Sequence, residues 1–177
     1  MTIRKFKAGD LFPSIRLNSL NLGEVDLGKP LNGKDWHLVV VYRGKHCPMC
    51  TSYLIQLEQL KNKFYDIGLS ILAVSADSEE KASAHNQEMG LSFPVAYGLS
   101  IEQMKDLGLY ISHPRSAQET DIPFAEPGIY VINEKGQVQV TDISNAPFAR
   151  PDLETLVGGL GFIRDPENNY PIRGTHE

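Results

Sequence analysis

The 177-residue sequence predicts an α/β fold in which a mixed β-sheet is flanked by helices. Between residues 36 and 106, apolar strand-like runs alternate with amphipathic segments, which predicts parallel strands joined by helices. Hairpin-like patterns at 14–27 and 128–143 add antiparallel strands on either side of that core, so the sheet is expected to be mixed.

The first elements run as far as a long helix. Residues 14–20 and 24–27 alternate apolar and polar side chains, which predicts a short N-terminal hairpin extension. Residues 36–42 (WHLVVVY) form an apolar run typical of a strand buried on both faces. From Pro48 onward apolar residues recur every three or four positions. This predicts an amphipathic helix that ends near Gly68 and has its proline in the first turn.

A second strand and helix follow. Residues 69–76 (LSILAVSA) predict another buried strand. Residues 77–90 predict a helix, with Asp77 and Glu80 spaced as a capping box and Gly90 as the stop.

The next stretch is less regular. Residues 93–98 predict a short strand, and Ser100 with Gln103 predicts a capping box for a brief helix. Residues 109–127 contain three prolines and no clean period, so we expect a long loop.

The chain is expected to close with a hairpin over 128–143 and a helix from Asp152 to 163. We therefore predict one domain over residues 1–165 and a C-terminal tail over 166–177. The order of elements is that of a thioredoxin-type fold.

Composition excludes several partners. A formal net charge of −5 disfavours nucleic acid and anionic membrane surfaces, which need a basic face. The sequence contains no run of about 18 apolar residues, so no membrane span is predicted. The N-terminus lacks the apolar region of a secretory signal, so we expect a cytoplasmic protein.

The only two cysteines, Cys47 and Cys50, lie between the 36–42 strand and the following helix. A structural disulfide is disfavoured by a reducing cytoplasm and by the small loop it would close. A zinc site needs two further ligands, and no histidine pair has metal-ligand spacing. Two inert buried thiols remain an alternative.

Redox chemistry fits this position better. A thiol at a helix N-terminus is stabilised as thiolate by unpaired amides and the helix dipole, so Cys47 is expected to be an ionised, accessible nucleophile. Cys50, one turn later, is suited to resolve a mixed disulfide or sulfenic acid on Cys47. Arg43 and Arg115 are candidate stabilisers of the anion, and Glu126 is a candidate proton shuttle.

The segment YRGKHCPMC, residues 42–50, resembles the YRG-x-x-C-P-x-C signature of bacterial peroxiredoxin-like proteins. These form part of the alkyl hydroperoxide reductase/thiol-specific antioxidant (AhpC/TSA) group of the thioredoxin-like superfamily. The similarity extends to KAGDLFPSIRL near the start, EPGIYVINEKGQV at 126–138 and NNYPIRG near the end.

The resemblance implies an oxidoreductase of antioxidant type that acts through Cys47 and Cys50. Pro127 would be the cis-proline beside the thiols, and the Glu126 backbone would bind an extended substrate. The substrate is a hydroperoxide or a protein disulfide, and the reductant an external thiol from thioredoxin, glutaredoxin or glutathione. The sulfurs carry the electrons, so no cofactor or metal is required, and a homodimer is left open.

The sequence departs from true peroxiredoxins at two positions. A proline seven residues before the cysteine and a Thr or Ser three before it are replaced by Val40 and Gly44. The motif is therefore closer to a thioredoxin Cys-x-x-Cys, and both substrates stay open. A non-catalytic binding module that uses loop 109–127 for recognition is the alternative function.

Overall fold

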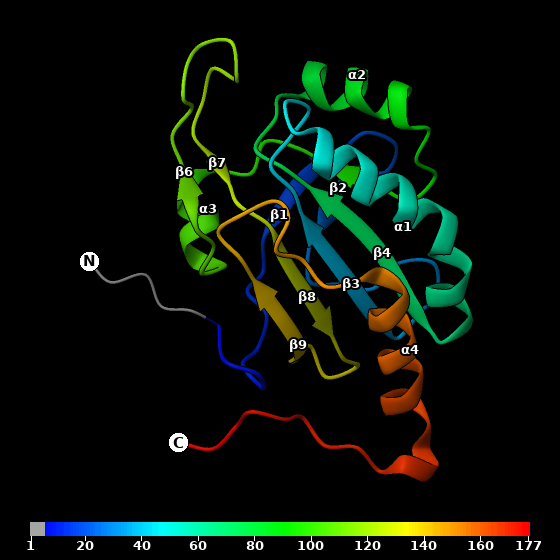
Figure 1. Cartoon of the computed structure of the whole chain (residues 1–177). Helices are drawn as coiled ribbons and strands as arrows, with labels where there is room; N and C mark the ends of the chain where they lie inside the picture. Colours follow the sequence, from blue (N-terminus) through cyan, green and yellow to red (C-terminus); the bar gives the residue numbers. More distant parts are fainter. Residues whose placement is uncertain (1–5) are drawn as a thin grey trace.

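A computed structural model describes residues 6–177 and contains a seven-stranded sheet in the order β2-β1-β5-β4-β3-β8-β9 (Figure 1). Its elements are β1 Arg16–Ser19, β2 Gly23–Asp26, β3 Trp36–Val41, α1 Pro48–Asp66, β4 Leu69–Val74, α2 Glu79–Met89, β5 Val95–Ala96, α3 Ile101–Asp106, β6 Ile111–Ser112, β7 Phe124–Ala125, β8 Gly128–Ile132, β9 Val138–Ile143, α4 Leu153–Arg164 and the short 3₁₀ helix η1 Pro166–Asn168.

The mixed sheet confirms the predicted α/β class. β3, β4 and β5 pair in parallel at the centre, the β8–β9 hairpin adds antiparallel strands beyond β3, and the β1–β2 hairpin adds them beyond β5. Every residue of β3 and β4 is buried, as expected of strands covered on both faces.

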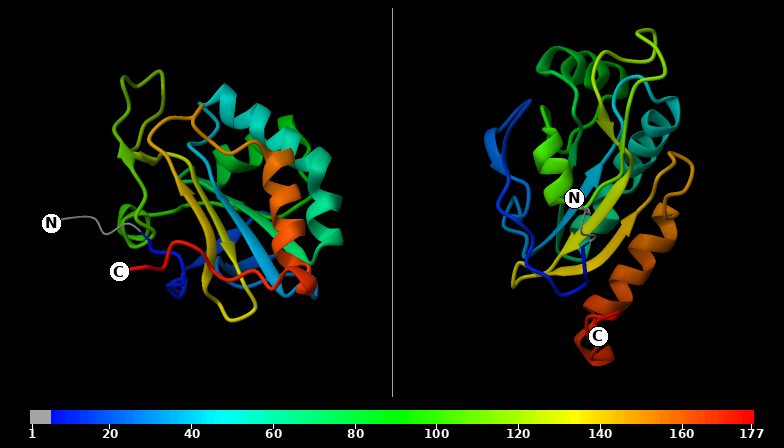
Figure 2. Two further views of the ribbon diagram at one scale, coloured as in Figure 1. Left: turned by 60° about the horizontal axis from the view of Figure 1, so that its bottom comes forward. Right: turned by 90° about the vertical axis from the view of Figure 1, so that its left-hand side faces the viewer.

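Helices α1 and α4 cover one face of the sheet, while α3 and the chain from Phe6 to Ile15 lie on the other (Figures 1 and 2). On the first face, Leu54, Leu57 and Phe64 of α1 pack with Leu160 of α4 in one apolar cluster. That cluster also contains both cysteines, so the thiols adjoin the core. Within residues 6–177 no helix has the length and apolarity to cross a membrane.

Two local predictions are wrong. Ser78, rather than Asp77, caps α2 by accepting a hydrogen bond from the Lys81 amide, because Asp77 is turned inward to the amide of Lys45. The segment 109–127 is not wholly irregular, since β6 and β7 pair antiparallel within it.

The other end signals behave as predicted. Ser100 and Gln103 form the capping box of α3, Gly90 ends α2 with a φ of 68°, and Asp152 caps α4. The division at residue 165 stays a prediction, and its start at residue 1 lies outside the described residues.

Candidate thiol site

Cys47 lies where the chain leaves the sheet and enters α1. It is the N-cap of that helix, and its sulfur accepts a hydrogen bond from the Cys50 amide at 3.3 Å. Pro48 occupies the first turn, where no amide hydrogen is required. The predicted position at a helix N-terminus is therefore what the structure has.

The two thiols differ strongly in acidity. The pKa of Cys47 is lowered from 9.0 to about 6, first by the hydrogen bond from the Cys50 thiol and further by the Cys50 amide and Arg43, which together outweigh burial. The pKa of Cys50 is raised by the same bond to Cys47 and by burial. The pair therefore holds one thiolate, on Cys47, near neutral pH.

Accessibility differs from the prediction. Cys47 is only 1% exposed and Cys50 is fully buried, so neither sulfur is open to a substrate in this conformation. The physical reason is that the first turn of α1 packs into the apolar cluster with Tyr42 and Leu54, and the sulfurs are part of that packing.

Arg43 connects Cys47 to the segment after β7. Its side chain hydrogen-bonds the Cys47 sulfur, which raises the pKa of Arg43 against the desolvation that burial imposes. Its Nε lies 3.2 Å from Oε2 of Glu126, whose side chain is 5% exposed. Its Cζ is 4.8 Å from the ring centroid of Phe124, and Ser112 donates to the other Glu126 oxygen at 2.8 Å. The guanidinium is thus held from two sides.

Pro127 does not have the geometry that the resemblance implies. No cis peptide bond occurs in residues 6–177, so Pro127 follows a trans bond, the lower-energy form for X-Pro. Between β7 and β8, the Glu126 amide donates to the Tyr110 carbonyl and the Ser144 amide donates to the Pro127 carbonyl. The Glu126 amide, one of the backbone groups expected to bind substrate, is therefore already paired.

Gly44 sits where a peroxiredoxin carries a hydroxyl, and the structure shows why a larger residue does not fit. Its φ is +135°, and a Cβ there would lie 2.7 Å from Oδ1 of Asp77. The other Asp77 oxygen accepts from the Lys45 amide at 2.8 Å and so fastens the loop before Cys47. The sequence alone predicts Asp77 only as a helix cap.

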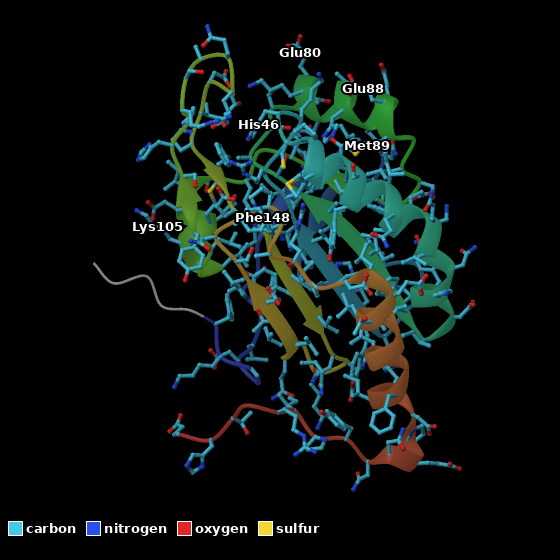
Figure 3. The ribbon with its side chains drawn as sticks, viewed as in Figure 1. His46, Glu80, Glu88, Met89, Lys105 and Phe148 are labelled. Carbon is cyan, nitrogen blue, oxygen red and sulfur yellow. The ribbon has the colours of Figure 1, made fainter. Side chains whose placement is uncertain are left out.

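Arg150 is a second cation that sequence reasoning missed. It follows β9, a hundred residues from the cysteines, so only the packing of the β9–α4 loop on α1 could reveal it. Its Cζ lies 4.4 Å from the centroid of Tyr53, one turn beyond Cys50, and the Tyr53 hydroxyl donates to the Pro151 carbonyl at 2.7 Å. In Figure 3, Phe148 of this loop and His46 both lie near the start of α1.

Two histidines also approach the site. Oγ1 of Thr51 lies 2.8 Å from Nε2 of His85 and donates to the Cys47 carbonyl, so α2 contacts the first turn of α1. The His46 ring packs on Phe124 with centroids 4.5 Å apart. Burial first, and then Arg43, lower the pKa of His46.

Arg115 is not brought to Cys47. Its side chain is 87% exposed and pairs with Glu119 at 2.7 Å, on the rim of a groove of about 1210 Å³ between the 115–121 segment and α2. Across the described part of the chain, no cluster of three or more His, Cys, Asp or Glu side chains could hold a metal ion.

Comparisons with known proteins identify the family and the fold of this chain. The family model for Redoxin matches residues 7–157. A 1-Cys peroxiredoxin of Dictyostelium discoideum is 29% identical over 117 residues, which cover 62% of this chain; the chain spans about half, 46%, of that relative.

Two solved structures share the fold. One is the reduced 2-Cys peroxiredoxin of Plasmodium vivax, with a TM-score of 0.74, 18% identity and coverage of 92% of this chain and 84% of that one. The other is Mycobacterium tuberculosis AhpC, with a TM-score of 0.73, 17% identity and coverage of 93% and 96%. With the family match spanning most of its length, this chain belongs to the Redoxin family and has the thioredoxin-like fold of peroxiredoxin-like proteins.

Proposed function

We propose that the protein is a thiol-disulfide oxidoreductase with Cys47 as nucleophile and Cys50 as resolving thiol. The Cys47 thiolate attacks one sulfur of a substrate disulfide, forms a mixed disulfide and releases the other sulfur as a thiolate. Cys50 then attacks Cys47, and the second substrate sulfur leaves as a thiol. The two protein sulfurs end as a disulfide, which an external thiol returns to the dithiol.

One observation carries this proposal. The Cys47 sulfur accepts the Cys50 amide at the start of α1, and its pKa of about 6 leaves it largely ionised near neutral pH. A thiolate is the species that attacks disulfides and peroxides. Because both sulfurs are buried, the packing around Cys47 must open before a substrate can reach it.

Disulfides are the primary substrate we propose, because Gly44 and the Asp77 carboxylate occupy the place of the hydroxyl expected to hold a peroxide. Hydroperoxide reduction is the second candidate and is favoured by membership of the Redoxin family. The external reductant is thioredoxin, glutaredoxin or glutathione, which suits a reducing compartment such as the cytoplasm.

Alkylation of Cys47 as a function of pH tests the proposed nucleophile. The midpoint is expected near pH 6 in the wild type. It should rise in Cys50→Ala, which removes the thiol donor, and rise less in Cys50→Ser, which keeps a hydroxyl. A wild-type midpoint near 8.5, the ordinary value for a thiol, would overturn the proposal.

Two turnover assays separate the candidate substrates. Reduction of insulin disulfides without consumption of hydroperoxide supports the disulfide assignment, and the reverse result overturns it. The alternative of a non-catalytic binding module predicts that Cys47→Ser changes neither assay.

A further inference from the structure

Arg150 has guanidinium donors that no neighbouring group in the described chain satisfies. Its Nε and Nη1 atoms are buried and have no hydrogen-bond partner among the described residues. No ion pair within residues 6–177 includes it. Arg150 as a whole is only partly buried, but these two donors are shielded from solvent. Shielded donors without a partner are unfavourable, so an anion that accepts from them would be stabilised.

The β9–α4 loop holds the Arg150 guanidinium close to the first turns of α1. Arg150 stacks on the Tyr53 ring at 4.4 Å, and the neighbouring Pro151 carbonyl accepts the Tyr53 hydroxyl at 2.7 Å. Tyr53 lies three residues after Cys50, so the two share one face of the helix. Ring and hydrogen bond together fix the guanidinium beside Tyr53, one helical turn beyond Cys50.

We propose that Arg150 is the positioning residue that stabilises the Cys50 thiolate when Cys50 attacks the mixed disulfide on Cys47. This assignment rests on the proposed function. The two thiols then have separate cations: Arg43 serves the attacking sulfur and Arg150 the resolving one.

The order in which the two thiols carry negative charge during the reaction explains why a second cation is needed. While Cys47 is a thiolate, Cys50 keeps its proton, because it donates to that anion and is buried. Once Cys47 is bonded to a substrate sulfur, its negative charge is gone and that hydrogen bond is lost. Burial still opposes ionisation of Cys50, while Arg150 and the Arg43 backbone both favour its thiolate.

The resolving step balances with these groups alone. Cys50 loses its proton and its sulfur attacks the Cys47 sulfur. The Cys47–Cys50 bond forms as the bond to the substrate sulfur breaks. The departing thiolate takes up a proton, which balances the one that Cys50 released. The protein sulfurs are oxidised by two electrons and the substrate disulfide is reduced.

The chromogenic disulfide DTNB separates the two steps in one experiment. The first thionitrobenzoate is released when Cys47 forms the mixed disulfide, and the second when Cys50 displaces it. Raising the pKa of Cys50 by about one lowers its thiolate fraction tenfold and raises its nucleophilicity about threefold, so the net loss is about threefold. Arg150→Gln is therefore expected to slow the second release by at least about threefold and leave the first unchanged.

Matched variants distinguish the assignment from a general loss of charge or fold. Arg43→Gln is expected to slow the first release. Arg16→Gln, which removes a surface charge on β1, is expected to slow neither the first nor the second release. Arg150→Lys keeps the charge and should restore most of the second rate. In the Cys47→Ser background, Arg150→Gln should raise the alkylation midpoint of Cys50 by about one pH unit.

Equal slowing of both releases, or an unchanged second release, would overturn the role of Arg150 while the proposed function stands. If the wild-type protein releases no first thionitrobenzoate, the proposed function itself is wrong, and the role of Arg150 is then wrong as well. Thermal melts of Arg150→Gln and Arg150→Lys identify a variant that has merely unfolded, and Arg150→Lys then decides the case.

Discussion

His37 lies in β3 and is fully buried. Protonation of its ring is expected to make the folded state less stable in acid. Its Nδ1 is 2.7 Å from the hydroxyl of Ser70 on β4. Burial lowers its pKa from 6.5 to about 4, against smaller opposing effects of hydrogen bonds to Ser70 and Leu27. Because the folded state holds this histidine neutral, acid favours the unfolded chain, which takes up the proton more readily.

The size of the effect follows from these two pKa values. They lie about 2.5 apart, and each unit corresponds to roughly 1.4 kcal/mol, so the full contribution is about 3 kcal/mol. The stabilisation is fully present above pH 6.5, falls by about 2 kcal/mol at pH 5, and is lost as the pH falls through 4.

Urea unfolding of the wild type and His37→Asn between pH 7 and 4 measures this contribution. The variant is less stable at pH 7, and the gap between the two unfolding free energies should shrink by about 2 kcal/mol at pH 5. His176→Asn, on the exposed C-terminal segment, should track the wild type. A gap that stays constant from pH 7 to 5 would refute the reasoning.

Three further substitutions have defined outcomes. Gly44→Thr should lower the unfolding free energy by about 2 kcal/mol or more and add no hydroperoxide reduction, because φ is +135° and Asp77 fills the space; a stable, more active variant contradicts this. Arg164→Ala breaks a bidentate contact with Asp35 at 2.7 and 3.2 Å, so urea unfolding should show a loss of about 1–2 kcal/mol, and no loss would count against it. Ser100→Ala should cost about 1 kcal/mol in the same assay, with Ser100→Gly costing less.

The site shows where local reasoning stops. The placement of Cys47 at a helix start was predictable, because the strand 36–42, Pro48 and the apolar period after it are all local signals. The closure of the site was not, because burial of the thiol depends on how α1 packs against the sheet. The trans bond at Pro127 differs from the cis bond that the resemblance implies, and nothing in the sequence around the proline reveals it.

The sequence by itself determined the order of strands and helices, the hairpins at both ends of the sheet, and a pair of thiols one turn apart with the first at the start of α1. Each of these depends on residues close together in the chain, through period, capping and turn chemistry. Only the tertiary structure decided which distant groups surround the thiol site: Asp77 binds the Lys45 amide, Glu126 pairs with Arg43, and Arg150 stacks on Tyr53, each from a separate connection. Electrostatic effects in such a site depend on distance and burial, and both are set by packing rather than by sequence separation.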